Sequence, residues 1–217
     1  MLTERGRVQT SKQVKDYVFC RECEQRFSRG GEHYALGQVR LKGRFPLLST
    51  LQSSNQRTSG GFTFHYDVST LGIDKEKLAY FALSVFWRAS VHIWHHDKST
   101  PLIQLGKYEE QIRTYLLRTS PFPASVALLL FVCTDPYSQN TFYEPSLGMS
   151  NPMGWSFQAR GLNFYLNEAD GAPLPLDATK ACLIKGTKDM VVSLSCAEKV
   201  LGAAARLINI ANQNRNR

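Results

Sequence analysis

The sequence lacks the long apolar runs that mark membrane proteins. A membrane-spanning helix needs about eighteen or more consecutive apolar residues with few or no charges, and no such run is present. The nearest stretch, residues 78–94, carries Arg88 in its middle and is typical of a buried helix. The N-terminus also lacks the apolar core of a signal peptide. We therefore expect a cytoplasmic protein with no membrane partner.

Cysteines are few, and their number is odd. The five cysteines lie at positions 20, 23, 133, 182 and 196, a scatter that does not indicate a disulfide framework. Cys133 and Cys182 fall in apolar runs, where a free cysteine usually behaves as a small hydrophobic residue. This usage favours a reducing compartment.

Several motifs of common enzyme classes are missing. The chain has no P-loop, no G-x-G-x-x-G, no G-x-S-x-G and no acidic calcium loop. Cys196 lies at a helix start where a thiol could be activated, but no His or Asp partner is identifiable, so we interpret it as structural. The sequence leaves open whether the protein is an enzyme.

Positive charge is abundant. The formal net charge is +8 and the sequence pI is about 9.3, with many of the basic residues in the first 45 positions. This balance favours a polyanionic partner, nucleic acid first, although a basic protein without such a ligand shows the same balance. The candidate phosphate contacts are Arg5, Arg7, Arg21, Arg26 and Arg29.

The apolar periodicity predicts a mixed fold. Asp74 is a plausible N-cap for a helix that is apolar on nearly all sides and should lie at the centre of the domain. A second helix is expected over residues 106–118, and a final one from the capping box at Ser195. Strands are expected at residues 62–68, 126–133, 157–166, 180–185 and 190–194.

Breaks and loops complete this description. Gly30 and Gly31 predict the end of a short helix, and loop signals within residues 40–64 and 135–153 predict irregular chain. We expect an α+β fold, in which an antiparallel sheet packs on the central helix and the C-terminal helix. Residues 1–45 form a basic segment with a short zinc-knuckle-like element. Residues 46–217 form the α+β domain, and the two segments together make one continuous unit.

The pair Cys20 and Cys23 is the most specific chemical motif. Two thiols three positions apart at a helix start can bind one metal ion, and a four-ligand zinc site is commonly built from two such pairs. Residues 1–19 contain no Cys or His to supply the other half. The further ligands would be His33, His65, the cluster beginning at His92, or residues of a second chain. Two alternatives remain open: structural free thiols, and a redox pair, which the neighbouring Glu22 and Glu24 disfavour.

A family resemblance rests on two patches. Residues 17–28, YVFCRECEQRFS, and the residues SVFWR at 84–88 resemble the C-x-x-C-E-x-x-F-S and S-x-x-W-R signatures of a family of uncharacterised bacterial proteins. That resemblance implies an N-terminal HNH-like or treble-clef-like module. The additional Cys pair and Ser-His element that often open family members have no counterpart here. Either the module has been lost, or the chain starts upstream of Met1.

A histidine cluster follows the central helix. His92 and His96 are four residues apart, so on a helix they would face the same side as two metal ligands should. Imidazolium groups also complement the dipole at a helix C-terminus, which is the simpler interpretation.

Arg88 interrupts the apolar stripe of the central helix, and Trp87 next to it widens that stripe. A buried guanidinium needs a partner, and the candidates in the chain are Glu22, Glu24 and Glu109. The alternative is an anion anchor, in which Arg88 binds phosphate while Trp87 stacks nearby.

These observations predict a non-catalytic or degenerate HNH-like protein that binds nucleic acid or a protein partner within a bacterial complex, with zinc as its expected cofactor. A homo-oligomer is also compatible with the sequence. The competing hypotheses are a metal-dependent nuclease, with His33, His92 and His96 as further ligands, and a small-ligand sensor in a defence-type system.

Overall fold

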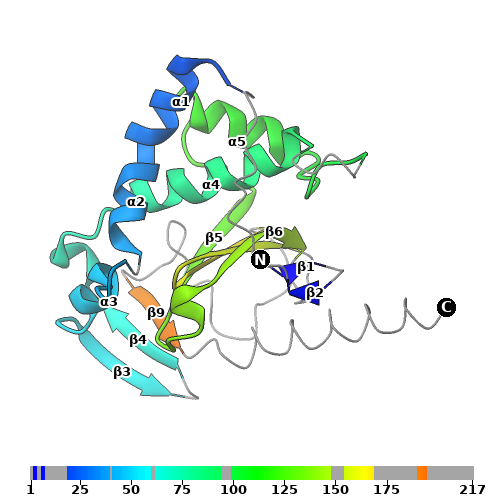
Figure 1. The fold of residues 1–217 in the computed structure, drawn as a ribbon. Helices are drawn as coiled ribbons and strands as arrows, with labels where there is room; N and C mark the ends of the chain where they lie inside the picture. Colours follow the sequence, from blue (N-terminus) through cyan, green and yellow to red (C-terminus); the bar gives the residue numbers. More distant parts are fainter. Residues whose placement is uncertain are drawn as a thin grey trace.

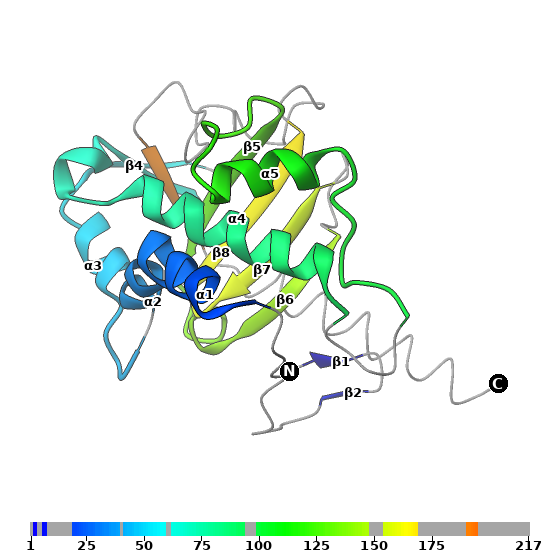
Figure 2. The ribbon, with the colours of Figure 1, turned by 90° about the horizontal axis from the view of Figure 1, so that it is seen from above.

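A seven-stranded sheet forms the base of the molecule, with helices over one face (Figures 1 and 2). This computed structural model describes residues 2–3, 6–7, 19–39, 41–59, 62–93, 99–147, 154–168 and 190–194, with only the backbone described at 2–3, 6–7, 190 and 194. The strand order is β3-β4-β9-β5-β8-β7-β6. Every neighbouring pair is antiparallel except β5 and β9, which are parallel. An α+β fold with a mostly antiparallel sheet is thus confirmed. The strands are β3 (Asn55–Ser59), β4 (Phe62–Tyr66), β5 (Val126–Cys133), β6 (Phe142–Leu147), β7 (Trp155–Ala159), β8 (Leu162–Glu168) and β9 (Met190–Leu194).

Three strands follow the sequence expectation closely. β5 spans the expected residues 126–133, β9 spans 190–194, and β4 covers most of 62–68. The single strand expected over 157–166 is wrong, because the chain reverses within it. Arg160 and Gly161 have φ values of 42° and 93°, and Ala159 pairs with Leu162 across a two-residue turn. Two positive φ values in such a turn are typical of the tight hairpins that join twisted strands.

The two edge strands were missed by the sequence analysis. All five residues of β3 are exposed, so this strand has no alternation of apolar and polar residues to reveal it. β6 contains Pro145 and a register shift between Tyr143 and Ser146, both of which are tolerated at a sheet edge. Two short helices also fall in the segments expected to be irregular. They are α3 (Pro46–Leu51), which has Pro46 at its first position, and the 3-10 helix η3 (Ser138–Asn140). Another 3-10 helix, η2 (Val68–Leu71), follows β4.

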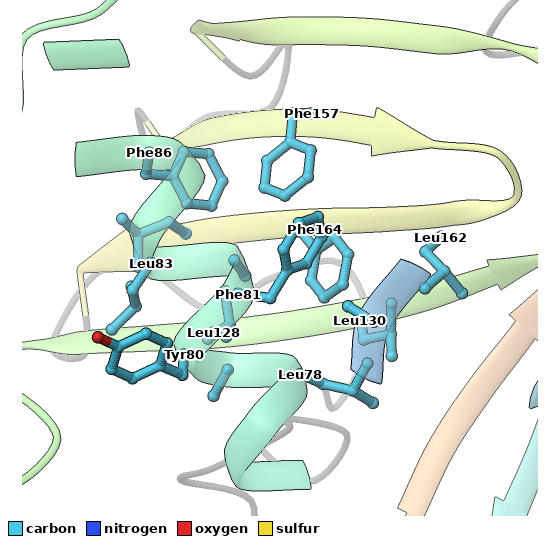
Figure 3. Close-up of a cluster of buried hydrophobic side chains, with 14 of the residues drawn as sticks. Leu78, Tyr80, Phe81, Leu83, Phe86, Leu128, Leu130, Phe157, Leu162 and Phe164 are labelled. Atoms are coloured by element: carbon cyan, nitrogen blue, oxygen red, sulfur yellow. The ribbon is translucent and has the colours of Figure 1, made fainter. Parts of the chain in front are cut away.

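The central helix is α4 (Lys75–Val91). It begins as expected at Asp74, whose side chain accepts a hydrogen bond of 3.0 Å from the amide of Lys77. Phe81 and Phe86 project from α4 onto the sheet, where they meet Phe157 and Phe164 edge to face (Figure 3). The second helix, α5 (Tyr108–Leu116), contacts α4 through Tyr115, whose ring lies 5.9 Å from that of Tyr80. No helix within the described ranges has both the length and the apolar character needed to cross a bilayer.

An N-terminal helical arm crosses α4. It consists of α1 (Arg21–Phe27), the π-helix η1 (Ser28–Glu32) and α2 (His33–Gln38), and the backbone stays helical through both junctions. The expected break at Gly30 and Gly31 is therefore wrong. Both glycines are buried against α4: a Cβ at Gly30 would overlap the ring of Tyr80, and one at Gly31 would overlap the carbonyl oxygen of Lys77. The glycines are needed for close helix packing rather than for a turn.

One cysteine expectation is also corrected. Cys133, at the end of β5, is disulfide-bonded rather than free, while Cys20 and Cys23 are free thiols. Cys182 and Cys196 lie outside the described residues. So do the strand expected over 180–185 and the final helix expected from Ser195. Near the N-terminus, β1 (Leu2–Thr3) and β2 (Gly6–Arg7) form a small antiparallel pair.

Replacing Gly31 tests the packing of the arm on α4. We expect Gly31→Ala to destabilise the protein by about 1–3 kcal/mol, the usual cost of overpacking, because the new Cβ meets backbone that cannot move aside. Gly37→Ala is the matched control, since its Cβ would meet nothing within 4 Å. The control should be neutral or stabilising by up to about 1 kcal/mol. Urea unfolding of both variants measures the difference, and equal stabilities would contradict the packing role.

Candidate functional site

The cysteine pair lies at the exposed start of the arm. Cys20 is the N-cap residue of α1, with extended backbone angles, and Cys23 lies in the first turn. Their sulfur atoms are 3.4 Å apart, with Cys20 exposed and Cys23 partly buried against the core. The helix start thus brings both thiols to one point, as the spacing predicted.

This separation suits one edge of a zinc site. Tetrahedral zinc with bonds of about 2.3 Å to sulfur places two sulfurs about 3.8 Å apart, so a small adjustment would admit the metal. Among the described residues, however, no group of three or more Cys, His, Asp or Glu side chains is gathered to hold an ion. His33 and His92 are therefore not assembled with the cysteine pair, and His96 lies outside the described ranges. The structure supplies two ligands that fit zinc, and a complete site needs others.

The two thiols differ in acidity. The pKa of Cys20 is lowered, mainly by the backbone amide of Cys23 and next by its thiol, which both stabilise the thiolate. The pKa of Cys23 is raised, first by its hydrogen bond with Cys20 and then by burial. Cys20 is therefore the more nucleophilic thiol of the pair at neutral pH.

The arm also carries the predicted phosphate-binding arginines. Arg21, Arg26 and Arg29 are all exposed. None of them is ion-paired within the part of the chain that the structure describes. Of the other two candidates, Arg5 lies outside the described residues, and Arg7 is described only by its backbone in β2.

A further arginine joins this surface through the fold. Arg118 follows α5, is exposed, and places its guanidinium 5.0 Å from the centre of the Tyr80 ring. Burial raises the pKa of Tyr80, and the positive charges of Arg118 and Arg26 both oppose that increase. Both arginines therefore lie close to the same buried ring, although they are far apart in the sequence. No sequence motif signals Arg118, so the analysis of the chain missed it.

Arg88 has a carboxylate partner, but not one of the three expected. Its Nη2 lies 3.2 Å from Oε1 of Glu32, with 18% and 27% of the two side chains exposed. Its Nε donates to the carbonyl oxygen of Ser84, and its guanidinium lies 5.3 Å from the centre of the Phe27 ring. Arg88 thus ties α4 to the arm.

Trp87 lies beside this ion pair. Its ring centre is 5.6 Å from that of Phe19 and 6.3 Å from that of Phe27. The Trp87 indole N–H is buried and has no hydrogen-bond partner among the described residues. The indole ring packs against the start of the arm rather than standing open for a ligand to stack on.

His65, which was expected only as a distant zinc ligand, is buried in a hydrogen-bonded network. His65, on β4, is 2% exposed, and its Nδ1 lies 3.0 Å from the carbonyl oxygen of Leu51 and 2.9 Å from Oγ of Ser54. Because a carbonyl only accepts, Nδ1 carries the proton and Nε2 accepts from Oγ of Ser193 at 2.7 Å. Burial lowers the pKa of His65, against an opposing effect of the Leu51 carbonyl.

The pair of His65 and Ser193 has the geometry of a base and a nucleophile, yet Ser193 is only 3% exposed. A hydroxyl so enclosed does not reach a substrate from solvent. The pair instead joins α3, β4 and β9 through a satisfied polar network, which is how buried polar groups are normally accommodated.

The comparisons with known proteins add no relative. No family model matches the chain, and no curated protein or solved structure matches it either. The resemblance to the bacterial family and its HNH-like module stays a prediction.

The acidity of Cys20 predicts the order of alkylation. In the folded protein near pH 8, we expect iodoacetamide to modify Cys20 before Cys23, because Cys20 is exposed and its pKa is lowered. Cys23→Ala should slow the reaction at Cys20, since the thiol that helps to stabilise the thiolate is removed and no other donor replaces it. Peptide mass spectrometry over a time course follows both sites. Equal rates at the two cysteines, or faster labelling of Cys23, would contradict this assignment.

His65 predicts a pH-dependent stability. A histidine whose pKa is lower in the folded than in the unfolded state makes unfolding easier as pH falls below its ordinary value of 6.5. The stability that depends on neutral His65 is fully present above pH 6.5 and is lost as pH falls through the folded-state pKa. Over that range the free energy of unfolding falls by at most about 1.4 kcal/mol per pH unit.

Urea unfolding between pH 8 and pH 5 measures this slope. His65→Gln should be less stable at pH 8 but should lose part of the slope, whereas a change at the exposed His33, His33→Gln, should leave the slope as it is. An unchanged slope in His65→Gln would show that other groups cause the pH dependence.

Proposed function

We propose that this protein is a non-catalytic nucleic-acid-binding protein of the HNH-like type, which contacts phosphates through the exposed arginines of α1 and η1. The observation that carries the proposal is the set Arg21, Arg26 and Arg29, exposed and without ion pairs in the described structure, on a chain of net charge +8. Free guanidinium groups on one helical arm suit a polyanion, because they can pair with phosphate without first breaking an internal ion pair.

The arrangement of charge along the arm supports this role. The acidic residues Glu22 and Glu24 occupy the first turn of α1, where the helix dipole favours anions. Arg26 and Arg29 lie further along, so the positive charge concentrates toward η1 and toward Arg118, which follows α5. The Arg88 guanidinium is engaged by Glu32 and Ser84, which favours the arm over an Arg88 anchor as the site for an anion.

Zinc fits this proposal as a structural ion. Cys20 and Cys23 would supply two ligands at the start of the arm, completed by residues outside the described ranges or by a second chain. Such an ion would fix the start of the basic arm. A protein partner within a complex is compatible with the same surface, and a metal-dependent nuclease is the alternative if further ligands gather at the cysteine pair.

Salt-dependent binding tests the proposal. We expect the protein to bind labelled DNA or RNA with an affinity that falls as salt rises, because binding releases counterions from phosphates. The triple variant Arg21→Gln/Arg26→Gln/Arg29→Gln should bind more weakly. It should also reduce the slope of log affinity against log salt by about 2–3, at roughly 0.7–0.9 for each lost contact. Fluorescence anisotropy at several salt concentrations gives both quantities.

The control removes the same charge elsewhere. In Lys42→Gln/Arg44→Gln/Arg113→Gln the three side chains are also exposed, and Arg113 is already paired with Glu110. This variant should keep most of the slope. Equal losses in the two triple variants would mean that net charge acts without a defined site, and no binding by the unaltered protein would rule out the proposed function.

A further inference from the structure

The face of the sheet turned away from α4 carries a row of aromatic rings on β4. Successive residues of a strand point to opposite faces, and His65 points toward α3 on the helix-covered face. Phe62, Phe64 and Tyr66 therefore point to the other face, where they surround the fully buried Val192 of β9. Each of the three rings is only partly buried. The row is thus a half-open apolar surface rather than part of the main core.

The neighbouring strand adds a positive charge to this row. β3 pairs with β4 so that Arg57 lies directly opposite Phe64, and Asn55 opposite Tyr66. Residues opposite each other in a sheet share a face, so Arg57 lies on the same face as Phe64 and next to it in the register. β3 forms the edge of the sheet, and all of its residues are exposed. In β3, β4 and β9 together, Arg57 alone carries a permanent charge.

Packing of Val192 does not by itself account for this composition. Any large apolar side chains would cover a valine, but here every covering residue of β4 is aromatic, and the rings of Phe62 and Phe64 lie 6.4 Å apart. Arg57 is exposed and, within the described structure, has no ion pair. Flat rings in a row beside a free guanidinium match the chemistry of unpaired bases joined by phosphates.

We propose that this aromatic row binds single-stranded nucleic acid, with bases stacked on Phe64 and Tyr66 and a phosphate paired with Arg57. The inference rests on the proposed function, because it names the form of nucleic acid that the protein prefers. A duplex keeps its bases stacked on each other, so only a single strand presents base faces to the rings. The net charge of +8 favours a polyanion over a neutral apolar ligand, and Arg57 places a positive charge at the edge of the row.

Substitution of one ring provides the first test. We expect Phe64→Leu, which keeps an apolar cover over Val192 but removes the ring, to weaken binding of a labelled single-stranded oligothymidylate by about five-fold or more. Affinity for a duplex of the same length should stay within about two-fold. Thr58→Ala is the control, because Thr58 pairs with Thr63 on the opposite face of the same two strands. Urea unfolding of each variant confirms that it folds as the unaltered protein does.

Cross-linking provides a second readout that needs no substitution. Ultraviolet irradiation of the complex with oligothymidylate should join the oligonucleotide to Phe62, Phe64 or Tyr66. All three residues fall in one tryptic peptide, residues 58–75. Cross-links confined to other peptides, together with unchanged affinity in Phe64→Leu, would overturn the inference.

The outcomes separate the two proposals. If the triple arginine variant of the arm loses binding while Phe64→Leu retains it, the arm is the nucleic-acid site and the aromatic row is not. If Phe64→Leu loses single-strand binding while the arm variant retains it, the aromatic row is the site and the arm is not. If the unaltered protein binds no single strand, the row serves to cover the sheet or to receive another part of the protein, and the inference is wrong.

Discussion

The burial of α4 is the constraint on which the rest of the structure depends. Phe81 and Phe86 pack on the sheet, while Tyr80 on another side of the helix contacts α5 and Gly30 of the arm. A helix that is apolar on nearly all sides must be covered on nearly all sides, since each fully buried large side chain contributes about 1.5–3 kcal/mol. The sheet, α5 and the arm each satisfy part of that requirement.

The arm is consequently a rigid support for the groups at its surface. Gly30 and Gly31 let it approach α4 closely, and Arg88 pairs with Glu32 across the same contact. Both features place α1 so that its cysteine pair and arginines face outward. The second proposed surface, the aromatic row on β4, lies on the other side of the sheet. A single strand long enough to meet both surfaces would have to pass around an edge of the sheet, and β3 with Arg57 is the edge that adjoins the row.

The parts of the fold that could be predicted are those with a strong local pattern. The cap at Asp74 and the apolar stripe after it placed α4, and a continuous apolar run placed β5. The errors have an equally physical origin. Gly30 and Gly31 lower the intrinsic stability of an isolated helix, so they predict its end. In the folded protein they are needed instead, because a Cβ at either position would overlap Tyr80 or Lys77. The polar strand β3 shows no pattern because, as an edge strand, it buries nothing.

The sequence alone determined the mixed fold class, the central helix, the positive charge and the position of two neighbouring free thiols, Cys20 and Cys23, at a helix start. All of these follow from spacing or composition within a few residues or from a sum over the chain. Only the tertiary structure decided that Arg88 pairs with Glu32, that Arg118 joins Arg26 near Tyr80, and that Arg57 stands beside the aromatic row. Each of these contacts joins residues from separate elements, so it depends on how helices pack and strands pair, which no local pattern specifies.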